Sequence, residues 1–268
     1  MRQSVSGGAE VQVFEEGLPL TGERTVPGVA RENYWFRRHE AVYNWIAQPG
    51  LAGTLVEAGS GEGYGAELLR SAGAQVVAVD YDQPAVTHLR NRYPGVAGMR
   101  ANLVELPIAD DSMDYLVSLQ VIEHLWDLPA FFREAHRVLR PGGQLIVSTP
   151  NRLTFSPGLG RGQKPTNPFH VEEFDAGQIA PLIRAAGFLD AHTFGLFAGP
   201  QLAACEAERG SIVQRQVDAI LAEDWPDELL ADVIGITAAH FEIRVIGDES
   251  AVADSSLDLI GVARKADW

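Results

Sequence analysis

Residues 55–65, LVEAGSGEGYG, decide the fold of this chain, because they join an apolar run to a turn built almost entirely of glycine. The apolar residues predict a buried strand, the glycines a tight turn, and Tyr64 the start of a helix. Glycine has no Cβ, so a turn of this composition lets another molecule approach the backbone closely. This stretch therefore predicts a ligand site between a strand and a helix.

A second apolar run, residues 75–79, ends in Asp80. A carboxylate at the tip of the strand that follows a glycine turn is placed to bind the two hydroxyls of a ribose. Together, the turn and Asp80 predict an α/β domain that binds a nucleoside.

The spacing of the glycines bears on which nucleoside is bound. The turn has Gly59-x-Gly61-x-Gly63, and Tyr64 stands where the dinucleotide fingerprint G-x-G-x-x-G requires its third glycine. Glu57, before the turn, suits a ligand that carries a cationic amino acid better than one that carries a pyrophosphate. On this segment alone, an NAD site and a strand–turn–helix without a ligand both stay open.

Composition limits the remaining possibilities. The chain has 268 residues, of which 46% are hydrophobic, and this is enough for one well-buried core with an added segment. A net charge of −15, from 21 basic and 36 acidic residues, argues against nucleic-acid partners and anionic membrane surfaces. Cys205 is the single cysteine, which excludes an internal disulfide. We expect a cytoplasmic protein, since no apolar run suggests a membrane span or a signal peptide.

Strands and helices alternate through the first two thirds of the chain. Apolar spacing predicts an amino-terminal helix over residues 29–47, ended by Pro49-Gly50. The alternation after it predicts a mainly parallel sheet with helices on both faces. Strands are predicted at residues 54–58, 75–80, 98–101, 113–119 and 144–148, and helices at 64–71, 83–92 and 128–138.

The pattern changes after Thr149. Residues 151–170, rich in proline and glycine, predict a long loop of the functional or disordered kind. A helix is predicted at 176–186, an inserted helical pair at 200–235, and further strands at 189–197, 241–246 and 257–263. We therefore divide the chain into an N-terminal lid and helix segment, 1–50, and one ligand-binding domain, 51–268, in which residues 199–236 form a helical cap.

Three further motifs follow in order, ANLVELP at 101–107, SLQVIEHL at 118–125 and LRPGG at 139–143. With the glycine turn and Asp80, they resemble the class I S-adenosylmethionine-dependent methyltransferases, most closely their type 11-like small-molecule branch. The resemblance covers about residues 53–190. It implies a seven-stranded, Rossmann-like, doubly wound sheet of order 3-2-1-4-5-7-6 with the last strand antiparallel. In such α/β sheets the ligands bind at the carboxyl ends of the strands.

The resemblance assigns the methionine and ribose parts of S-adenosylmethionine to Glu57, the glycine turn and Asp80. Glu57 and the turn would hold the methionine portion, with backbone against its carbon chain. Asp80 would accept hydrogen bonds from both ribose hydroxyls. The turn residues so assigned are Gly59, Gly61 and Gly63.

The resemblance assigns the contacts to the adenine and the sulfonium to residues farther along the chain. Tyr81 would lie against the adenine, and Leu103 would cover it and offer its backbone N–H. Asn102 stands where the family usually has Asp, and its amide oxygen can still accept from the adenine amino group. Gln120 would face the sulfonium and amino groups through its carbonyl.

The acceptor side depends on a proton. Methyl transfer from a sulfonium is an in-line displacement, driven mainly by holding the reacting atoms about 3–3.5 Å apart. A hydroxyl acceptor also needs a base, and His124 and His170 are the predicted candidates ahead of His240. Both could instead be structural, as a helix-capping and a loop histidine. Glu123, His124 and Asp127 are close in sequence, but such neighbours are more often capping groups, and we assign no metal.

Aromatic residues and the N-terminal leader point to the acceptor class. Residues 21–28, TGERTVPG, resemble leaders of bacterial methyltransferases that modify sugars or polysaccharides. Aromatic side chains could form platforms for a sugar ring, although many aromatics simply pack the core. The predicted substrate-binding residues are Trp35, His39, Tyr43 and Phe169, with Tyr34 and Phe155 as further aromatics.

We therefore expect an O-methyltransferase that acts on a small-molecule or carbohydrate hydroxyl. Two other interpretations stay open. One is transfer to carbon or nitrogen, as in quinone- or amine-type enzymes. The other is a non-catalytic S-adenosylmethionine-binding protein.

Overall fold

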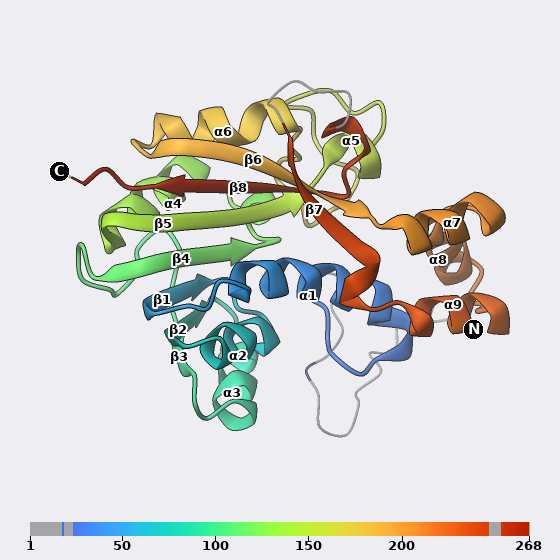
Figure 1. Ribbon diagram of the computed structural model, residues 1–268, viewed down its shortest axis with the longest axis horizontal. Helices are drawn as coiled ribbons and strands as arrows, with labels where there is room; N and C mark the ends of the chain where they lie inside the picture. The colour runs from blue at the N-terminus through green and yellow to red at the C-terminus, as the bar shows by residue number, and fades with distance from the viewer. Residues whose placement is uncertain (1–17, 19–23, 247–252, 268) are drawn as a thin grey trace, which may run out of the picture.

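The computed structural model describes Leu18, residues 24–246 and residues 253–267 (Figure 1). The beginning of the predicted lid segment, including residues 21–23 of the leader, lies outside the described residues. Within them, the chain forms one sheet of order β3-β2-β1-β4-β5-β8-β6-β7. Its strands are β1 (Gly53–Ala58), β2 (Ala74–Asp80), β3 (Ala97–Arg100), β4 (Met113–Leu119), β5 (Leu139–Pro150), β6 (Leu189–Ala198), β7 (Phe241–Ile246) and β8 (Asp258–Arg264).

The predicted α/β class is confirmed, and the predicted count of seven strands is wrong. Strands β1 to β5 are parallel, and β8 is antiparallel between β5 and β6. The difference is β7, which pairs antiparallel with the outer side of β6, from Thr193↔Ile246 to Ala198↔Phe241. Without this added edge strand, the order is the predicted one. The added strand lengthens the sheet at the edge farthest from Asp80.

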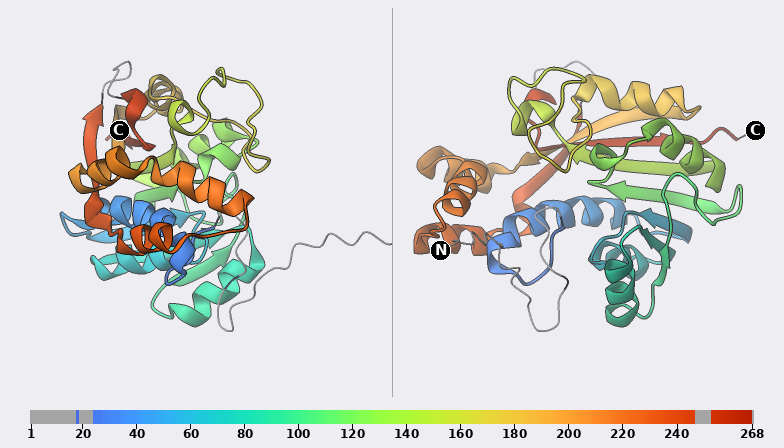
Figure 2. Two further views of the ribbon diagram at one scale, coloured as in Figure 1. Left: turned by 90° about the vertical axis from the view of Figure 1, so that its right-hand side faces the viewer. Right: turned by 180° about the vertical axis from the view of Figure 1, so that it is seen from behind.

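Helices cover both faces of the sheet, as the alternating pattern requires. The first face carries α4 (Leu128–Val138) and α6 (Ala176–Ala185), and the view from behind in Figure 2 shows α4 over β5. The second face carries α1 (Asn33–Ala47), α2 (Tyr64–Ser71) and α3 (Gln83–Arg92). Successive residues of β4 point to opposite faces, so that Leu116 and Val117 lie in two separate apolar clusters and are both fully buried.

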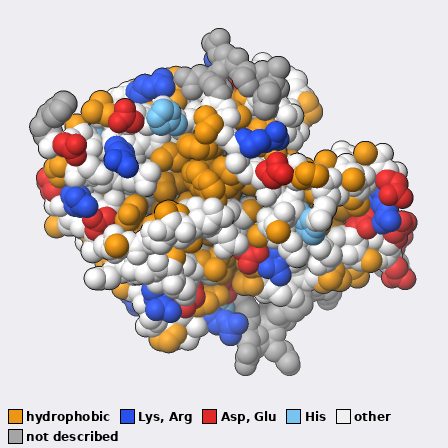
Figure 3. Space-filling view, in the orientation of Figure 1, with side chains coloured by type: hydrophobic (Ala, Val, Ile, Leu, Met, Phe, Trp, Pro, Cys, Tyr) orange, Lys and Arg blue, Asp and Glu red, His pale blue; other side chains and the backbone are white. Residues whose placement is uncertain are grey.

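Part of the second face is open beside α1. Phe194, Ile243 and Val262 come from β6, β7 and β8 and are only partly buried, and Val245 is 70% exposed. Figure 3 shows hydrophobic side chains gathered in a hollow near the middle of this side of the molecule. Helix α1 lies against this face from β1, where Tyr43 contacts Glu57, to β6, where Trp45 packs against Phe194 with ring centres 5.0 Å apart.

The predicted helical insertion contains three helices instead of a pair. They are α7 (Pro200–Arg209), α8 (Ile212–Leu221) and α9 (Asp227–Gly235), followed by the short helix η3 (Ala238–His240). They lie beyond the carboxyl ends of β4 and β5, on the side to which those arrows point (Figure 1). The third helix, α9, begins directly after its N-cap residue Pro226.

The predicted loop over residues 151–170 includes a short helix, α5 (Arg152–Phe155), and is held by ion pairs. Arg152 and Arg161 both pair with Asp175, which is buried at the start of α6. Hydrogen bonds and charge from the two guanidinium groups outweigh burial and lower the pKa of Asp175. The loop after β5 is therefore anchored at several points.

None of the helices formed by the described residues is long and apolar enough to cross a membrane.

Candidate active site

The glycine turn connects β1 to α2, and Gly59, Gly61 and Gly63 all have positive φ. At two of these positions a side chain has no room: a Cβ on Gly59 would meet Val121, and a Cβ on Gly63 would lie 2.8 Å from Leu89 Cδ1. A Cβ on Gly61 would meet nothing nearer than Arg24 Cγ at 3.8 Å. The middle of the turn therefore presents open backbone, as a cradle for a ligand requires.

Asp80 ends β2 beside this turn. Its Oδ2 accepts a 2.7 Å hydrogen bond from the N–H of Gly61, and its Oδ1 accepts one of 2.8 Å from the N–H of Asp82. The turn is also tied to β2 by the N–H groups of Gly59 and Ser60, which both donate to the carbonyl of Val79. The structure thus brings the glycine turn into direct contact with Asp80, the residue predicted to bind the ribose.

Glu57 is fully buried at the end of β1, beneath the turn. Its Oε1 accepts a 2.6 Å hydrogen bond from the hydroxyl of Tyr43, and its Oε2 has no hydrogen-bond partner among the described residues. Burial raises the pKa of Glu57 to about 8, and the charge of Asp80 adds to the rise while the Tyr43 hydroxyl opposes it. A buried carboxyl with an unused oxygen is suited to a cationic group.

The predicted substrate residue Tyr43 is buried, and its hydroxyl is engaged with Glu57. A Cβ on Gly65 would collide with the Tyr43 ring and would lie 2.5 Å from Glu57 Oε1. Sequence reasoning missed this role of Gly65, although the residue closes the stretch LVEAGSGEGYG. The signal that could have found it is a further glycine inside a helix, where glycine is unfavourable without a packing reason.

Glu62 holds the turn from the side of α3 and was also missed. It is buried, its Oε1 lies 2.7 Å from His88 Nε2, and its Oε2 accepts a 2.9 Å hydrogen bond from the Tyr93 hydroxyl. Nothing local in the sequence marks these long-range contacts.

The N-terminal leader crosses the turn. Arg24 forms a 2.9 Å ion pair with Asp82, and the hydroxyls of Thr25 and Tyr64 lie 2.8 Å apart. His39 Nδ1 lies 3.1 Å from the same Tyr64 hydroxyl. Burial, with the charge of Arg38, lowers the pKa of His39 to about 3, so this predicted substrate residue is neutral.

The residues predicted for the adenine follow β2 and β3. Tyr81 is 71% exposed, with the Arg100 guanidinium 5.5 Å from its ring centre, and Leu103 is buried. Asn102 Oδ1 accepts a 3.2 Å hydrogen bond from the N–H of Val104. This contact occupies one acceptor direction of the amide oxygen and sets its orientation.

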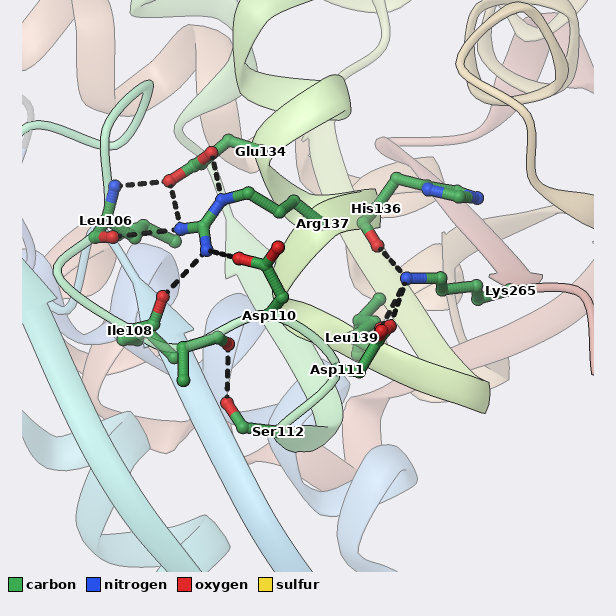
Figure 4. Close-up of polar contacts among 11 residues, drawn as sticks. Leu106, Ile108, Asp110, Asp111, Ser112, Glu134, His136, Arg137, Leu139 and Lys265 are labelled. Atoms are coloured by element: carbon green, nitrogen blue, oxygen red, sulfur yellow. Dashed lines mark hydrogen bonds and ion pairs between the residues drawn. The ribbon is translucent and has the colours of Figure 1, made fainter.

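The segment after Leu103 is held in place from α4 (Figure 4). Glu134 accepts a 2.6 Å hydrogen bond from the N–H of Leu106, and Arg137 donates to the carbonyls of Leu106 and Ile108. Arg137 also pairs with Glu134 and Asp110. Lys265, in the same view, donates to the carbonyls of His136 and Leu139 at the end of α4. This network fixes the loop that carries Asn102 and Leu103.

Gln120 follows β4 with a φ of 56°, which is unusual for a residue other than glycine. Its Nε2 donates to Ser148 Oγ at 3.1 Å and to Asp258 Oδ1 at 3.2 Å. Asp258 is fully buried and forms an ion pair with Arg38 of α1, with Arg38 Nε 2.7 Å from Oδ2. The backbone strain at Gln120 is thus supported by a buried ionic group beneath it.

The two predicted catalytic histidines meet. The rings of His124 and His170 lie 5.1 Å apart, edge to face. His124 Nδ1 lies 3.0 Å from the carbonyl of Phe169, and His170 Nδ1 lies 2.8 Å from Glu173 Oε1. Glu173, three residues after His170, was missed as the partner that orients this ring.

Glu123 is buried beside both rings, and its side chain and those of His124 and His170 bring ligand atoms within 4.8 Å of one another. Burial raises the pKa of Glu123, and the two histidines oppose the rise. Asp127, grouped with Glu123 and His124 at the sequence level, caps α4 instead by accepting from the N–H of Ala130 at 2.9 Å. His240, the third candidate base, caps η3 in the insertion.

The remaining predicted substrate residues are aromatic and sit apart. Trp35 packs against Phe155, with ring centres 6.2 Å apart, and Arg38 lies over both rings. Phe169 is 54% exposed beside His124. Tyr34 is buried.

Known proteins share both the sequence and this architecture. A family model described as a methyltransferase domain matches residues 56–147. A "probable S-adenosylmethionine-dependent methyltransferase" of Mycobacterium tuberculosis is 51% identical over 248 residues, which is 92% of this chain and 89% of the relative. A protein of the same description from Mycolicibacterium smegmatis is 48% identical over 92% of this chain and 95% of its own length.

The chain belongs to the S-adenosylmethionine-dependent methyltransferases. It is similar in fold to a solved Thermotoga maritima methyltransferase, titled as a possible histamine N-methyltransferase, with a TM-score of 0.59 and 19% identity over 89% of this chain and 96% of that one. S-adenosylmethionine is the cofactor of this methyltransferase. Its site fits that cofactor on three structural features: the open backbone at Gly61, the carboxylate of Asp80 beside it, and the unused buried oxygen of Glu57.

Proposed function

We propose that this methyltransferase transfers the methyl group to a hydroxyl of a small molecule or carbohydrate. The observation that carries the proposal is the meeting of His124 and His170, 5.1 Å apart, just after β4. In an α/β sheet of this kind, ligands bind at the carboxyl ends of the strands. A histidine pair at that edge supplies the base that a hydroxyl acceptor needs and that many other acceptors do not.

The donor is held by the residues around the glycine turn. The turn from Gly59 to Gly63, with its open backbone at Gly61, receives the methionine chain, and Glu57 receives its ammonium group. Asp80, already oriented by the N–H groups of Gly61 and Asp82, accepts the ribose hydroxyls. Bound S-adenosylmethionine supplies an electrophilic methyl carbon on a sulfonium that leaves as a neutral thioether.

The adenine lies against the residues that follow β2 and β3. Leu103 covers the ring, Tyr81 flanks it, and the Asn102 oxygen accepts from the amino group. The network of Glu134 and Arg137 fixes the loop that carries Leu103 and so orders this side before the donor binds. Gln120, held by Ser148 and Asp258, positions its carbonyl toward the sulfonium side.

The protein's part in the chemistry is to remove a proton and to exclude water. The carbonyl of Phe169 and the carboxylate of Glu173 each accept from the Nδ1–H of one imidazole. This tautomer leaves Nε2 as the basic nitrogen of each ring. When the acceptor oxygen attacks the methyl carbon, its proton passes to an imidazole, and Glu173 stabilises the resulting imidazolium at His170.

The flanking segments shape the acceptor site. Arg24 and Thr25 lie across the turn, which supports a lid role for the N-terminal segment. The insertion of α7, α8 and α9 lies beyond the carboxyl ends of the strands, which supports a role as a cap over the acceptor (Figure 1). Phe169, exposed beside His124, is the predicted acceptor residue nearest the histidine pair. Trp35 and His39 remain proposed acceptor residues on the amino-terminal helix, and Tyr43 supports Glu57.

The proposal is tested with labelled S-adenosylmethionine and a panel of glycans and small alcohols, followed by mapping of the methylated atom. His124→Ala or His170→Ala should lower turnover by about 10²-fold or more, with donor affinity nearly unchanged. His192→Ala, at an exposed position on β6, is the matched control. Turnover of both variants at the parent rate, or a methylated carbon or nitrogen in the product, would overturn the proposal.

A further inference from the structure

Three side chains with strong metal-ligand chemistry converge where β4 ends. Glu123 and His124 lie in the short helix η2 (Ile122–His124), and His170 comes from the end of the loop after β5. Their candidate ligand atoms all lie within 4.8 Å of one another, and Glu123 Oε1 is 4.0 Å from His124 Nε2. Zinc-type bonds are about 2.0–2.2 Å long, so two ligand atoms of one cation lie at most about 4.4 Å apart. Small side-chain rotations close the remaining gap.

The carboxylate in this group has unused bonding capacity in a buried position. Glu123 is 1% exposed, and its Oε2 has no hydrogen-bond partner among the described residues. The hydroxyl of Thr149 lies near enough to oppose the rise in the pKa of Glu123, but the two make no hydrogen bond of normal geometry. A buried polar atom without a partner is unfavourable, and a bound cation would offset that cost.

Both imidazoles are oriented as metal-bound histidines are. Such a histidine usually donates from its second nitrogen to a carboxylate or a backbone carbonyl, which fixes the tautomer and the ring. His170 Nδ1 lies 2.8 Å from the carboxylate of Glu173, and His124 Nδ1 lies 3.0 Å from the carbonyl of Phe169. Nε2 then carries the lone pair in each ring. At His170 this nitrogen lies 3.1 Å from Asn167 Nδ2, so ligation through it displaces the Asn167 amide.

The two segments are also locked together through the backbone. The N–H groups of Val171 and Glu172 both donate to the carbonyl of Glu123, at 2.7 and 3.3 Å. Each of these bonds joins the segment next to His170 directly to the helix that carries His124. The ligands are therefore brought together by the fold before any ion arrives, which limits the entropy lost on binding.

We propose that Glu123, His124 and His170 bind one divalent first-row transition cation, such as Zn²⁺, Mn²⁺, Co²⁺ or Ni²⁺. Two imidazoles and one carboxylate suit these ions, whereas Mg²⁺ and Ca²⁺ prefer sets of oxygen ligands. Three protein ligands leave positions open for water or for an acceptor hydroxyl. A hydroxyl bound there would become more acidic, which would favour its methylation. This role of the cation rests on the proposed O-methylation. With a cation bound, both imidazoles would serve as ligands instead of bases, and the proton of the more acidic bound hydroxyl would pass to solvent water.

The test is a calorimetric titration of tag-free, chelator-treated protein with Zn²⁺ and, separately, with Co²⁺. We expect one cation per chain, a raised Tm and visible d–d absorption of the cobalt form. His124→Ala and His170→Ala should each weaken binding by more than about 100-fold, and Glu173→Gln by about 10–100-fold. His192→Ala is the control and should bind like the parent.

Absence of saturable one-to-one binding would overturn the proposal. Unchanged affinity in the double variant H124A/H170A would do so as well, provided that its circular dichroism matches the parent. The titration needs no acceptor and no methyl transfer. If metal binding is normal but no hydroxyl is methylated, the proposed function is wrong and the metal site stands. If hydroxyls are methylated but no metal binds, the metal site is wrong and the proposed function stands.

Discussion

The hydroxyl of Tyr43 in α1 donates a 2.6 Å hydrogen bond to Oε1 of Glu57 at the end of β1. This bond connects the amino-terminal helix to the floor of the donor site. Since burial raises the pKa of Glu57 to about 8, the carboxyl is largely protonated at neutral pH in the protein without ligand. The donor site therefore stores a proton that a cationic ligand can displace.

Binding of S-adenosylmethionine should release that proton. A bound ammonium favours the charged carboxylate, so release should approach one proton per chain near pH 6.5. It should fall as the pH rises through about 8, where Glu57 is already ionised without ligand. Calorimetry in buffers of different ionisation enthalpy measures the release. The Glu57→Gln variant is the control, and equal proton release from it would remove Glu57 from the contact.

Asp80 should govern donor affinity. Loss of its charge-assisted hydrogen bonds in Asp80→Ala should weaken S-adenosylmethionine binding by about 10–100-fold, since such bonds contribute about 1.5–3 kcal/mol. Asp80→Asn keeps the shape of the side chain and loses its charge, so its affinity for S-adenosylmethionine should lie between those of Asp80→Ala and the parent. A dissociation constant for Asp80→Ala equal to that of the parent would contradict the ribose placement.

Gly65 should tolerate no side chain. The added Cβ of Gly65→Ala meets the Tyr43 ring and Glu57 Oε1, so we expect a loss of about 1–3 kcal/mol in the free energy of unfolding, together with weaker donor binding. Gly235→Ala is the matched control, because a Cβ at the end of α9 meets nothing within 4 Å. Urea unfolding compares the two, and equal stability of both variants would contradict the packing described here.

Removing one partner of the buried Arg38–Asp258 ion pair should strongly lower the free energy of unfolding. Both groups are buried, so Asp258→Ala leaves an unpaired guanidinium and should cost about 3–5 kcal/mol. The double variant R38M/D258L removes both charges and should be more stable than Asp258→Ala alone. Chemical unfolding measures the stability of each variant. A double variant no more stable than Asp258→Ala would show that the two charges are not coupled.

The half of the sheet around the glycine turn could be predicted from the sequence because its signals are local. The run into Gly59, the turn and the helix after it are continuous in the chain, and Asp80 follows the next strand directly. Two neighbouring parallel strands must bring their carboxyl ends to one edge, so the contact of Asp80 with Gly61 was predictable.

The other half depended on contacts between distant segments. Nothing within residues 241–246 shows that they pair with the outer side of β6, and the family pattern contains no strand there. The aromatic character of Tyr43 is visible in the sequence and predicts a substrate platform, whereas its hydrogen bond to Glu57 can be seen only in the structure. His124 and His170 were each predicted, but Glu123 as their partner required the backbone bonds that return the loop to η2.

The base of the helical insertion has a broader consequence. Ala198 and Phe241 are paired residues of β6 and β7, and the N–H of Gly199 donates to the carbonyl of His240 at 2.7 Å. Everything between them replaces the tip of a single hairpin. Because its two ends meet on facing residues, this excursion can lengthen, shorten or be exchanged while the register of the sheet stays intact. Under the proposed cap role, a change in this excursion would alter acceptor recognition and leave the strands that carry Glu57 and Asp80 in place.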